Sequence, residues 1–129
     1  MIELTKITLP IEAMTKKNHS QIVKVNGHPI LIPSKQYIEF EKSCKPYLLH
    51  YKMEIDEPIN LKVVFYRKTR RKVDLPNLLN SICDILVKYK VIADDNCLIV
   101  ASFDGSCVKY DKDNPRIEIE ITKGERCWE

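Results

Sequence analysis

One segment constrains the fold of this sequence more than any other, because it has the repeat of an amphipathic helix. Its apolar residues recur three and four positions apart, which places them on one helical face; they are Leu75, Leu78, Leu79, Ile82, Ile85, Leu86 and Tyr89. Asp74 is the expected N-cap, and Pro76 lies in the first turn, where a missing N–H loses no hydrogen bond. The rest of the chain must provide the surface that buries this face.

Segments that alternate apolar and polar residues predict strands as that surface. The alternation is strongest over 59–66, and over 117–121, where isoleucines alternate with glutamates. The second of these has one polar face, which is typical of a strand in a sheet that is wet on one side. Weaker alternation predicts further strands over 2–9, 97–103 and 106–110.

A hairpin and a second helix are predicted in the first half of the chain. Apolar segments over 22–25 and 29–32 flank Asn26-Gly27, a dipeptide preferred in tight hairpin turns. Ser34 is the expected N-cap of the second helix, and Pro46 is expected to kink or end it, since proline donates no backbone hydrogen bond. The residues that share a face of this helix are Tyr37, Phe40, Cys44 and Leu48.

The order of these elements predicts an α+β fold, in which one mixed sheet is packed by two main helices. A chain of 129 residues has the length of about one domain, so we expect residues 1–129 to form a single unit. Hydrophobic residues at 44% and charged residues at 30% are ordinary globular values and exclude a disordered chain. No apolar stretch approaches the ~18 residues that span a bilayer, and Met1–Lys6 has no export signal. We therefore expect a cytoplasmic protein with no membrane partner.

The cysteines do not indicate a metal site or a disulfide framework. There are five, an odd number with wide gaps, and none forms a C-x-x-C pair. We expect free, mostly buried thiols, with an exposed and oxidisable Cys127 near the end of the chain. Three scattered histidines add no zinc-binding spacing, so a zinc enzyme is not indicated.

The positive charge of the chain is concentrated in one run, Arg67-Lys68-Thr69-Arg70-Arg71-Lys72. This run holds five positive charges, so removing it from the net charge of +3 leaves −2 for the rest of the chain. Such a run is either a solvated loop or an anion-binding surface. The sequence pI of about 8.5 is low for a protein whose whole surface binds nucleic acid, so the basic character belongs to a patch.

Two groups of carboxylates flank the predicted helix, Asp74 before it and Asp94-Asp95 after it. Magnesium and manganese prefer hard oxygen ligands and often keep several waters beside one or two carboxylates. A metal of this kind hydrolyses phosphodiesters by polarising a phosphoryl oxygen and generating hydroxide. The simpler interpretation is a helix cap at Asp74 and a turn at Asp94-Asp95. From the residues alone, both interpretations stay open.

The stretch from Arg70 to Ile99 resembles the RusA family of Holliday-junction resolvases. The family's pattern is a basic run, a D-x-D-N-L motif, a lysine three residues on, an aspartate within the following helix, and a pair of aspartates after it. The matching residues are Asp74, Asn77, Leu78, Asp84, Asp94 and Asp95, with Lys109 in the closing strands and Asn18 near the start. The resemblance implies a RusA-like fold and a homodimer, of phage or prophage origin, that binds four-way DNA. It also implies paired strand cleavage with magnesium, for which manganese is a substitute.

The resemblance also implies roles for individual residues. Asp74, Asp94 and Asp95 are the expected catalytic and metal-binding residues, and Asp84 is a further candidate ligand. Asp84 lies ten positions after Asp74, about 80° around a helix, so it is poorly aimed at a shared site and is otherwise a solvated surface residue. The expected DNA-binding residues are Arg67, Lys68, Arg70, Arg71, Lys72, Asn77, Asn80 and Lys109.

Two positions depart from the family's pattern. Pro76 replaces the second aspartate of the D-x-D motif and cannot ligate a metal, while Asn80 replaces the lysine and cannot neutralise developing negative charge. Two hypotheses follow: a working magnesium-dependent nuclease, or a junction-binding protein whose metal site has degraded. A basic RNA-binding module is a weaker third hypothesis, since the sequence lacks the exposed aromatic platforms of such modules.

Chain geometry predicts that each metal site is shared between two subunits. The helix from Asp74 to Tyr89 is roughly 22 Å long at 1.5 Å per residue. The chain from Lys90 to Asp95 can return at most ~20 Å, so Asp95 reaches its own Asp74 only by an almost straight path. A two-fold dimer with antiparallel helices would instead join Asp74 of one subunit to Asp95 of the other. The alternative is that the apolar face of this helix serves only the core.

Overall fold

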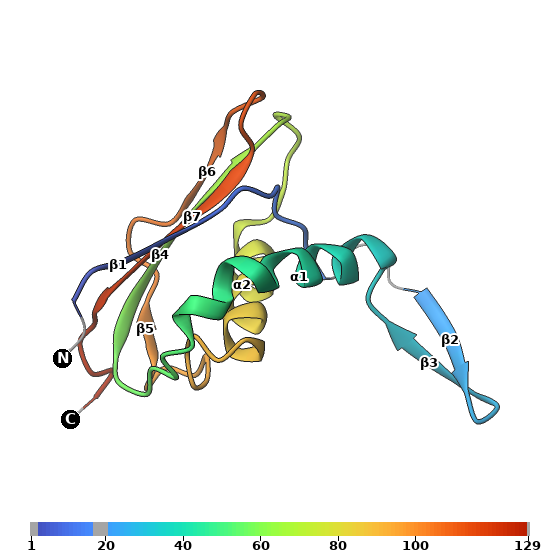
Figure 1. The fold of residues 1–129 in the computed structure, drawn as a ribbon, viewed down its shortest axis with the longest axis horizontal. Coiled ribbons are helices and arrows are strands. Elements are labelled where there is room, and N and C mark those ends of the chain that lie inside the picture. The colour runs from blue at the N-terminus through green and yellow to red at the C-terminus, as the bar shows by residue number, and fades with distance from the viewer. Residues whose placement is uncertain (1–2, 17–20, 129) are drawn as a thin grey trace.

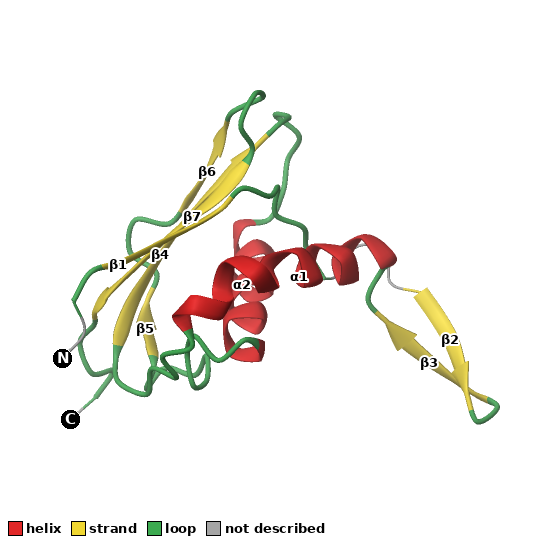
Figure 2. Cartoon of the chain, viewed as in Figure 1, coloured by secondary structure: helices red, strands yellow, loops and turns green. Residues whose placement is uncertain are grey.

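The computed structural model describes residues 3–16 and 21–128 and has the predicted α+β fold, with two helices against a mixed sheet (Figures 1 and 2). Asn18 and the first residues of the predicted strand over 2–9 lie outside the described residues. In chain order the elements are β1 Thr5–Leu9, β2 Gln21–Val25, β3 His28–Ile32, α1 Lys35–Leu48, the 3-10 turn Leu49–Tyr51, β4 Ile59–Arg67, α2 Leu75–Lys88, β5 Val100–Ser102, β6 Cys107–Tyr110 and β7 Arg116–Lys123.

The main sheet is built around β4, its longest strand. One edge of β4 pairs antiparallel with β7, which in turn pairs antiparallel with β1. The other edge pairs in parallel with two short strands, β5 at Ile59–Asn60 and β6 at Val64–Arg67. Because both parallel and antiparallel pairings occur, the sheet is mixed, as predicted. The basic run begins at Arg67, the last residue of β4.

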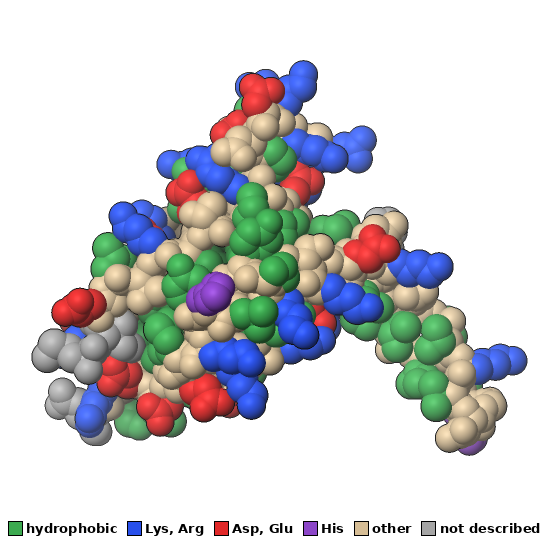
Figure 3. All heavy atoms as spheres, viewed as in Figure 1, with side chains coloured by type: hydrophobic (Ala, Val, Ile, Leu, Met, Phe, Trp, Pro, Cys, Tyr) green, Lys and Arg blue, Asp and Glu red, His purple; other side chains and the backbone are tan. Residues whose placement is uncertain are grey.

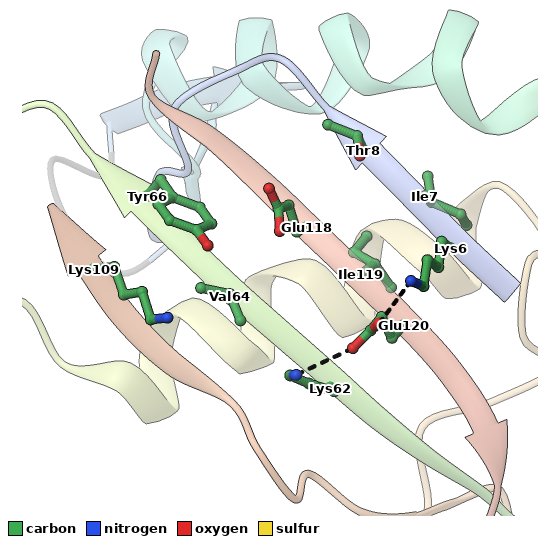
Figure 4. Close-up of a pocket in the computed structure, with 10 residues that line it drawn as sticks. All are labelled: Lys6, Ile7, Thr8, Lys62, Val64, Tyr66, Lys109, Glu118, Ile119 and Glu120. Carbon is green, nitrogen blue, oxygen red and sulfur yellow. Dashed lines mark ion pairs between the residues drawn. The ribbon is translucent and has the colours of Figure 1, made fainter. Parts of the chain in front are cut away.

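Both helices cover the same face of this sheet (Figure 1). The residues of β4 and β7 that point toward the helices are at most 1% exposed; they are Leu61, Val63, Phe65, Ile117, Ile119 and Ile121. The alternate residues Lys62, Tyr66, Glu118 and Glu120 line the opposite face, which no helix covers (Figure 4). The core therefore lies between the sheet and the helices, and the alternation in the sequence correctly assigned the two faces.

The helix α2 confirms the strongest sequence prediction to within one residue at its end. Leu78, Ile82, Ile85 and Leu86 are at most 1% exposed and form its core-facing side. The helix stops where Lys90 adopts a left-handed backbone conformation with φ of 63°, and the Val91 N–H turns back to donate to the Leu86 carbonyl at 2.9 Å. This reversal sends the chain back along the helix toward the loop of Asp94 and Asp95.

The helix α1 begins as predicted but continues past its proline. The Ser34 side chain caps the helix by accepting a hydrogen bond from the Tyr37 N–H at 3.1 Å. Pro46 was expected to kink or end the helix, yet α1 extends to Leu48, so it does not end there. Pro46 is exposed and lies in the last turn, where the carbonyl that loses its partner can bond to water.

The hairpin of β2 and β3 is confirmed and projects from the body at the N-terminal end of α1 (Figure 1). Asn26 and Gly27 both have positive φ, 53° and 80°, as a tight turn between antiparallel strands requires. The strands pair only with each other, and Ile22 and Leu31, which are opposite in register, are 73% and 70% exposed.

Two sequence predictions are wrong in detail. The strand expected over 97–103 is only Val100–Ser102, because the Asn96 carbonyl accepts hydrogen bonds from the Ile99 and Val100 N–H groups and folds the preceding residues into a turn. The cysteines are free, as expected, but they are not mostly buried. Only Cys44 and Cys83 are buried, whereas Cys97 and Cys127 are exposed.

No helix in the described part of the chain is long and apolar enough to cross a bilayer.

Candidate active site

Asp74 occupies the N-cap position of α2 without using its side chain as a cap. Its backbone carbonyl accepts the Asn77 and Leu78 N–H groups, but its carboxylate makes no capping hydrogen bond. The expected role as a helix cap is therefore wrong for the side chain. The contact of this carboxylate is with the side-chain amide of Asn77, which donates to Oδ2 at 3.3 Å. The Asp74 carboxylate is exposed, is oriented by Asn77 and makes no capping hydrogen bond, so it is free to bind a cation.

Asp94 and Asp95 lie in the loop after α2 and have different surroundings. The Asp94 carboxylate accepts hydrogen bonds from the Asp95 N–H at 2.7 Å and from the Asn96 side-chain amide at 3.1 Å, so it builds the turn. Partial burial raises the pKa of Asp95, with smaller contributions from a hydrogen bond with Asp94 and from the charges of Asp84 and Asp94. Asp95 therefore lies in a partly buried environment near other carboxylates, which an added cation would stabilise.

A groove lies along α2, and Asp95 is one of the residues that line it. Its lining residues are Leu75, Pro76, Leu79, Asn80, Cys83, Asp95 and Phe103. Burial raises the pKa of the Cys83 thiol to about 12, and the charge of Asp95 contributes, so Asp95 lies near that turn of the helix. Leu75 and Cys83 are separated by about 12 Å along the helix axis at 1.5 Å per residue. Asp74 precedes Leu75 at the start of α2, and Asp95 lines the groove from the loop that follows the helix.

The described residues include candidate metal ligands but no cluster of three or more of them. Among residues 3–16 and 21–128, no group of three or more His, Cys, Asp or Glu side chains could hold a metal ion. Asp74 with Asn77 forms one set of hard oxygen ligands, and Asp95, which lines the groove, forms another. Each set fits part of the coordination of a magnesium or manganese ion.

The Asp84 carboxylate forms an ion pair that the sequence did not indicate. Its partner is the Lys16 ammonium at 3.3 Å, and the Lys16 N–H donates to the Ser81 hydroxyl at 3.1 Å. These two contacts fasten the segment before the hairpin to the surface of α2. Asp84 is therefore a partly exposed residue of the helix surface with a paired carboxylate, and its charge also acts on Asp95.

The basic run forms the loop between β4 and α2 and leads directly to Asp74. Figure 3 shows Lys and Arg side chains gathered at this end of the molecule, where the run lies. Lys68, Arg70, Arg71 and Lys72 are exposed, and the Arg70 guanidinium stacks on the Tyr110 ring at 4.3 Å. The Lys68 N–H donates to the Glu12 carboxylate at 2.7 Å, which holds the start of the loop against the N-terminal segment. The buried Nε of Arg67 has no hydrogen-bond partner among the described residues.

The candidate site consists of a carboxylate at the start of α2, a second carboxylate that lines the groove along this helix, and a basic loop leading into the first. The model of the family described as endodeoxyribonuclease RusA matches residues 10–122, nearly the whole chain. The chain belongs to the RusA family. This confirms the resemblance, and membership supports an endonuclease of the kind that resolves Holliday junctions with a divalent metal ion. No curated protein matches this chain.

The two departures from the RusA motif lie in the same groove. Pro76 and Asn80 both line it, together with Asp95. In this RusA-family chain the departures therefore affect the lining of the candidate site itself. Asp74 and Asp95 match carboxylates of the motif, while the groove is lined by a proline and an asparagine where the motif has aspartate and lysine.

Lys109 is separated from the rest of the predicted RusA-type site. It is opposite Tyr66 in register, and both line a shallow pocket on the open face of the sheet (Figure 4). In this pocket the Glu120 carboxylate pairs with the ammonium groups of Lys62 at 3.2 Å and Lys6 at 3.6 Å. Asp74 and the groove lie on the helix side, so Lys109 belongs to a different surface from the one that carries Asp95.

Sequence reasoning missed two aromatic residues of this RusA-family site. Tyr110 supports Arg70, and Phe103 closes one side of the groove. Tyr110 is opposite Arg67 in the parallel pairing of β6 with β4, so both project to the helix side. Alternation over 106–110 gave the faces of the strand, but only the pairing of β6 with β4 shows which neighbours Tyr110 meets.

Proposed function

We propose that this protein is a magnesium-dependent endonuclease that cuts four-way DNA junctions by paired hydrolysis of phosphodiesters, with Asp74 and Asp95 as its metal ligands. The observation that carries the proposal is the Asp74 carboxylate, which stands at the start of α2 without capping it and directly follows the basic loop. A residue placed this way can bind a cation where the loop delivers a phosphate. Family membership supplies the class of reaction.

The active form is a homodimer in which two chains complete each site. Antiparallel packing of α2 against its symmetry copy would bring Asp74 of one subunit to Asp95 of the other and would form two identical sites. The groove supports this arrangement, because Leu75, Pro76, Leu79 and Phe103 give it an apolar lining that a second copy could cover. Two sites related by a two-fold axis suit symmetric cuts in a symmetric junction.

The residues of the site divide the work of hydrolysis. A bound divalent ion would polarise the phosphoryl oxygen and lower the pKa of a water molecule. Asp74 and Asp95 hold the ion, and the Asn77 amide orients the Asp74 carboxylate. Arg70 and Arg71 bind the neighbouring phosphates, with Arg70 held in place by the Tyr110 ring. Asn80 lines the groove at the place of the motif's lysine and contributes no charge to the transition state.

The second candidate is a junction-binding protein with little cleavage activity. It is favoured by one observation, namely that Pro76 and Asn80 both line the groove beside Asp95. Pro76 lacks the oxygen ligand of the motif's second aspartate, and Asn80 lacks the positive charge of the motif's lysine. The basic loop that would bind DNA is intact. This candidate shares the fold and the DNA interface with the first and differs only in catalysis.

A cleavage assay on a synthetic four-way junction separates the two candidates. We expect symmetric nicks in the presence of Mg²⁺ or Mn²⁺, none with a chelator, and none from Asp95→Asn protein, while a linear duplex of the same sequence stays intact. Tight, junction-selective binding without cleavage under either metal would establish the second candidate. Cleavage that persists in Asp95→Asn would contradict the assignment of the site.

The basic loop gives a prediction about binding. Replacing Arg70 and Arg71 with alanine should weaken binding to junctions of every sequence, because phosphate contacts release counterions without distinguishing bases. The slope of log affinity against log salt should fall in magnitude by about 2, since each lost contact removes roughly 0.9. Titrations at several salt concentrations measure the slope, and Lys42→Ala/Lys45→Ala on the exposed side of α1 is the charge-matched control. Equal slopes in the loop variant and wild type would remove the loop from the DNA interface.

The two departures from the family motif give a prediction about catalysis. Pro76→Asp/Asn80→Lys restores a carboxylate and a cation to the groove and leaves the net charge unchanged. We expect it to raise the rate of junction cleavage by about 10- to 100-fold, since one charge-stabilising group at a reacting centre contributes up to ~100–1,000-fold. Aspartate at the second position of a helix is favourable to the helix dipole, so folding should be unaffected. Single-turnover rates measure the gain, and Pro76→Asn/Asn80→Gln is the uncharged control. If both double variants cut no faster than wild type, these positions do not limit the reaction.

A further inference from the structure

Two exposed cysteines from distant parts of the sequence are in contact. The Sγ atoms of Cys97 and Cys127 lie 3.3 Å apart, although the residues are separated by 30 positions. Cys97 belongs to the turn after Asp95, and Cys127 to the segment that follows β7. Both side chains are exposed, so reagents in solution can reach them.

The start of β4 brings these two segments together. Ile59, at the start of β4, donates its N–H to the Ile99 carbonyl at 2.8 Å, which fixes the turn that carries Cys97. On the other edge of the same strand, Ile59 is opposite Lys123 of β7, and the Gly124 N–H donates to the Pro58 carbonyl at 2.9 Å.

Gly124 fixes the path of the second segment further. A Cβ at this position would lie 2.5 Å from the carbonyl carbon of Ile59, so the chain passes β4 more closely than any other residue type would allow. The approach of Cys127 to Cys97 is therefore set by backbone contacts on both edges of β4.

We propose that Cys97 and Cys127 form a reversible intramolecular disulfide by exchange with a small-molecule disulfide. One thiolate attacks the disulfide reagent, which gives a mixed disulfide and releases one thiol. The second cysteine then attacks the bonded protein sulfur and releases the other thiol. The two protein thiols lose two electrons and two protons, and the reagent is reduced to two thiols.

The geometry favours this pair over the other cysteines. A disulfide has an S–S distance of about 2.05 Å, so the sulfurs have to approach by roughly 1.3 Å from their separation of 3.3 Å. Both belong to exposed segments outside the strands and helices, where such an adjustment is small. Cys44 and Cys83 are buried in the core, and Cys107 lies within β6.

The bond would join the segment after β7 to the loop of the candidate active site. Cys97 follows Asp95 by two residues, and Asp94, Asn96 and the Leu98 N–H are already linked by side-chain hydrogen bonds within that loop. A disulfide at Cys97 would add an anchor to β7 at the end of this network. Amide groups in both segments would then exchange more slowly with solvent.

The test is oxidation of the full-length, folded protein by glutathione disulfide. We expect one intramolecular bond, with a mass about 2 Da lower and no added glutathione. Peptide mapping without reduction should find Cys97 linked to Cys127, and dithiothreitol should restore the original mass. Slower amide exchange over 94–98 and 124–127 in the oxidised protein should accompany the bond. This readout does not depend on nuclease activity, so the proposal can fail or hold independently of the proposed function.

Three single variants serve as controls. Cys97→Ser and Cys127→Ser should each lose the 2 Da product and take up one glutathione or form dimers, whereas Cys107→Ser should behave like wild type. The proposal is overturned if wild-type protein gives only mixed disulfides, only dimers linked between chains, or a bond between other cysteines. It is equally overturned if the Cys107→Ser variant alone fails to form the product.

Discussion

Mixing Asp74→Asn protein with Asp95→Asn protein should restore nicking of a four-way junction, although neither variant should cut on its own. Each substitution removes a metal ligand, so each homodimer should lose at least ~100-fold in cleavage rate, given the several kcal/mol that a metal contributes. After subunit exchange, a heterodimer with shared sites collects both lesions in one site and leaves the other intact. Its product is therefore a nick in one strand rather than paired cuts, and a denaturing gel distinguishes the two.

The control for this experiment is the same mixture kept under conditions that prevent subunit exchange, which should stay inactive. If both ligands of a site came from one chain, every site in every dimer would keep a lesion. A mixture that stays inactive after proven exchange would therefore rule out shared sites. The length of α2, which lies between Asp74 and the loop of Asp95 in the chain, is the structural reason for expecting restoration.

Replacing Phe65 with alanine should lower the free energy of unfolding by about 3–5 kcal/mol, the usual cost of removing a buried aromatic side chain. Phe65 is 1% exposed in the middle of β4 and lies between Ile117 of β7 and Val108 of β6. The loss is large beside the 5–15 kcal/mol that stabilise an ordinary domain. Urea denaturation followed by circular dichroism measures it as a lower midpoint with an unchanged slope.

Tyr47→Ala is the matched control for this variant. Tyr47 is an aromatic residue on α1 that is 42% exposed, so its removal deletes a ring without opening a core cavity. We expect a change within about 1 kcal/mol, because alanine also has the higher helix propensity. Equal losses in the two variants would contradict the position of Phe65 in the core.

The elements that were predicted correctly are those whose pattern is local. The helix α2 shows its repeat over four turns, and the hairpin depends on Asn26 and Gly27, whose positive φ values the turn requires. The residues that face the core from β4 and β7 also follow from alternation alone. Each of these features is fixed by neighbours within a few positions along the chain.

The errors come from contacts between distant parts of the chain. The strand over 97–103 is shortened by a turn at Asn96, and the end of that turn is held by Ile59, which lies 40 positions earlier. Pairing of Asp84 with Lys16 and of Cys97 with Cys127 likewise joins residues that no local pattern relates. Parallel pairing of β6 with β4 also decides that Lys109, whose DNA-binding role stays a prediction, lies on the open face of the sheet.

The sequence by itself determined the fold class, the family and the carboxylates of the candidate site, because periodicity and motif spacing are properties of the chain. The tertiary structure alone decided how those carboxylates are used. It showed that the Asp74 side chain does not cap its helix, that Asp94 builds a turn, and that Asp95 lines a groove along α2. Burial, hydrogen bonding and separation in space depend on packing between distant segments, and packing is what a linear pattern does not encode.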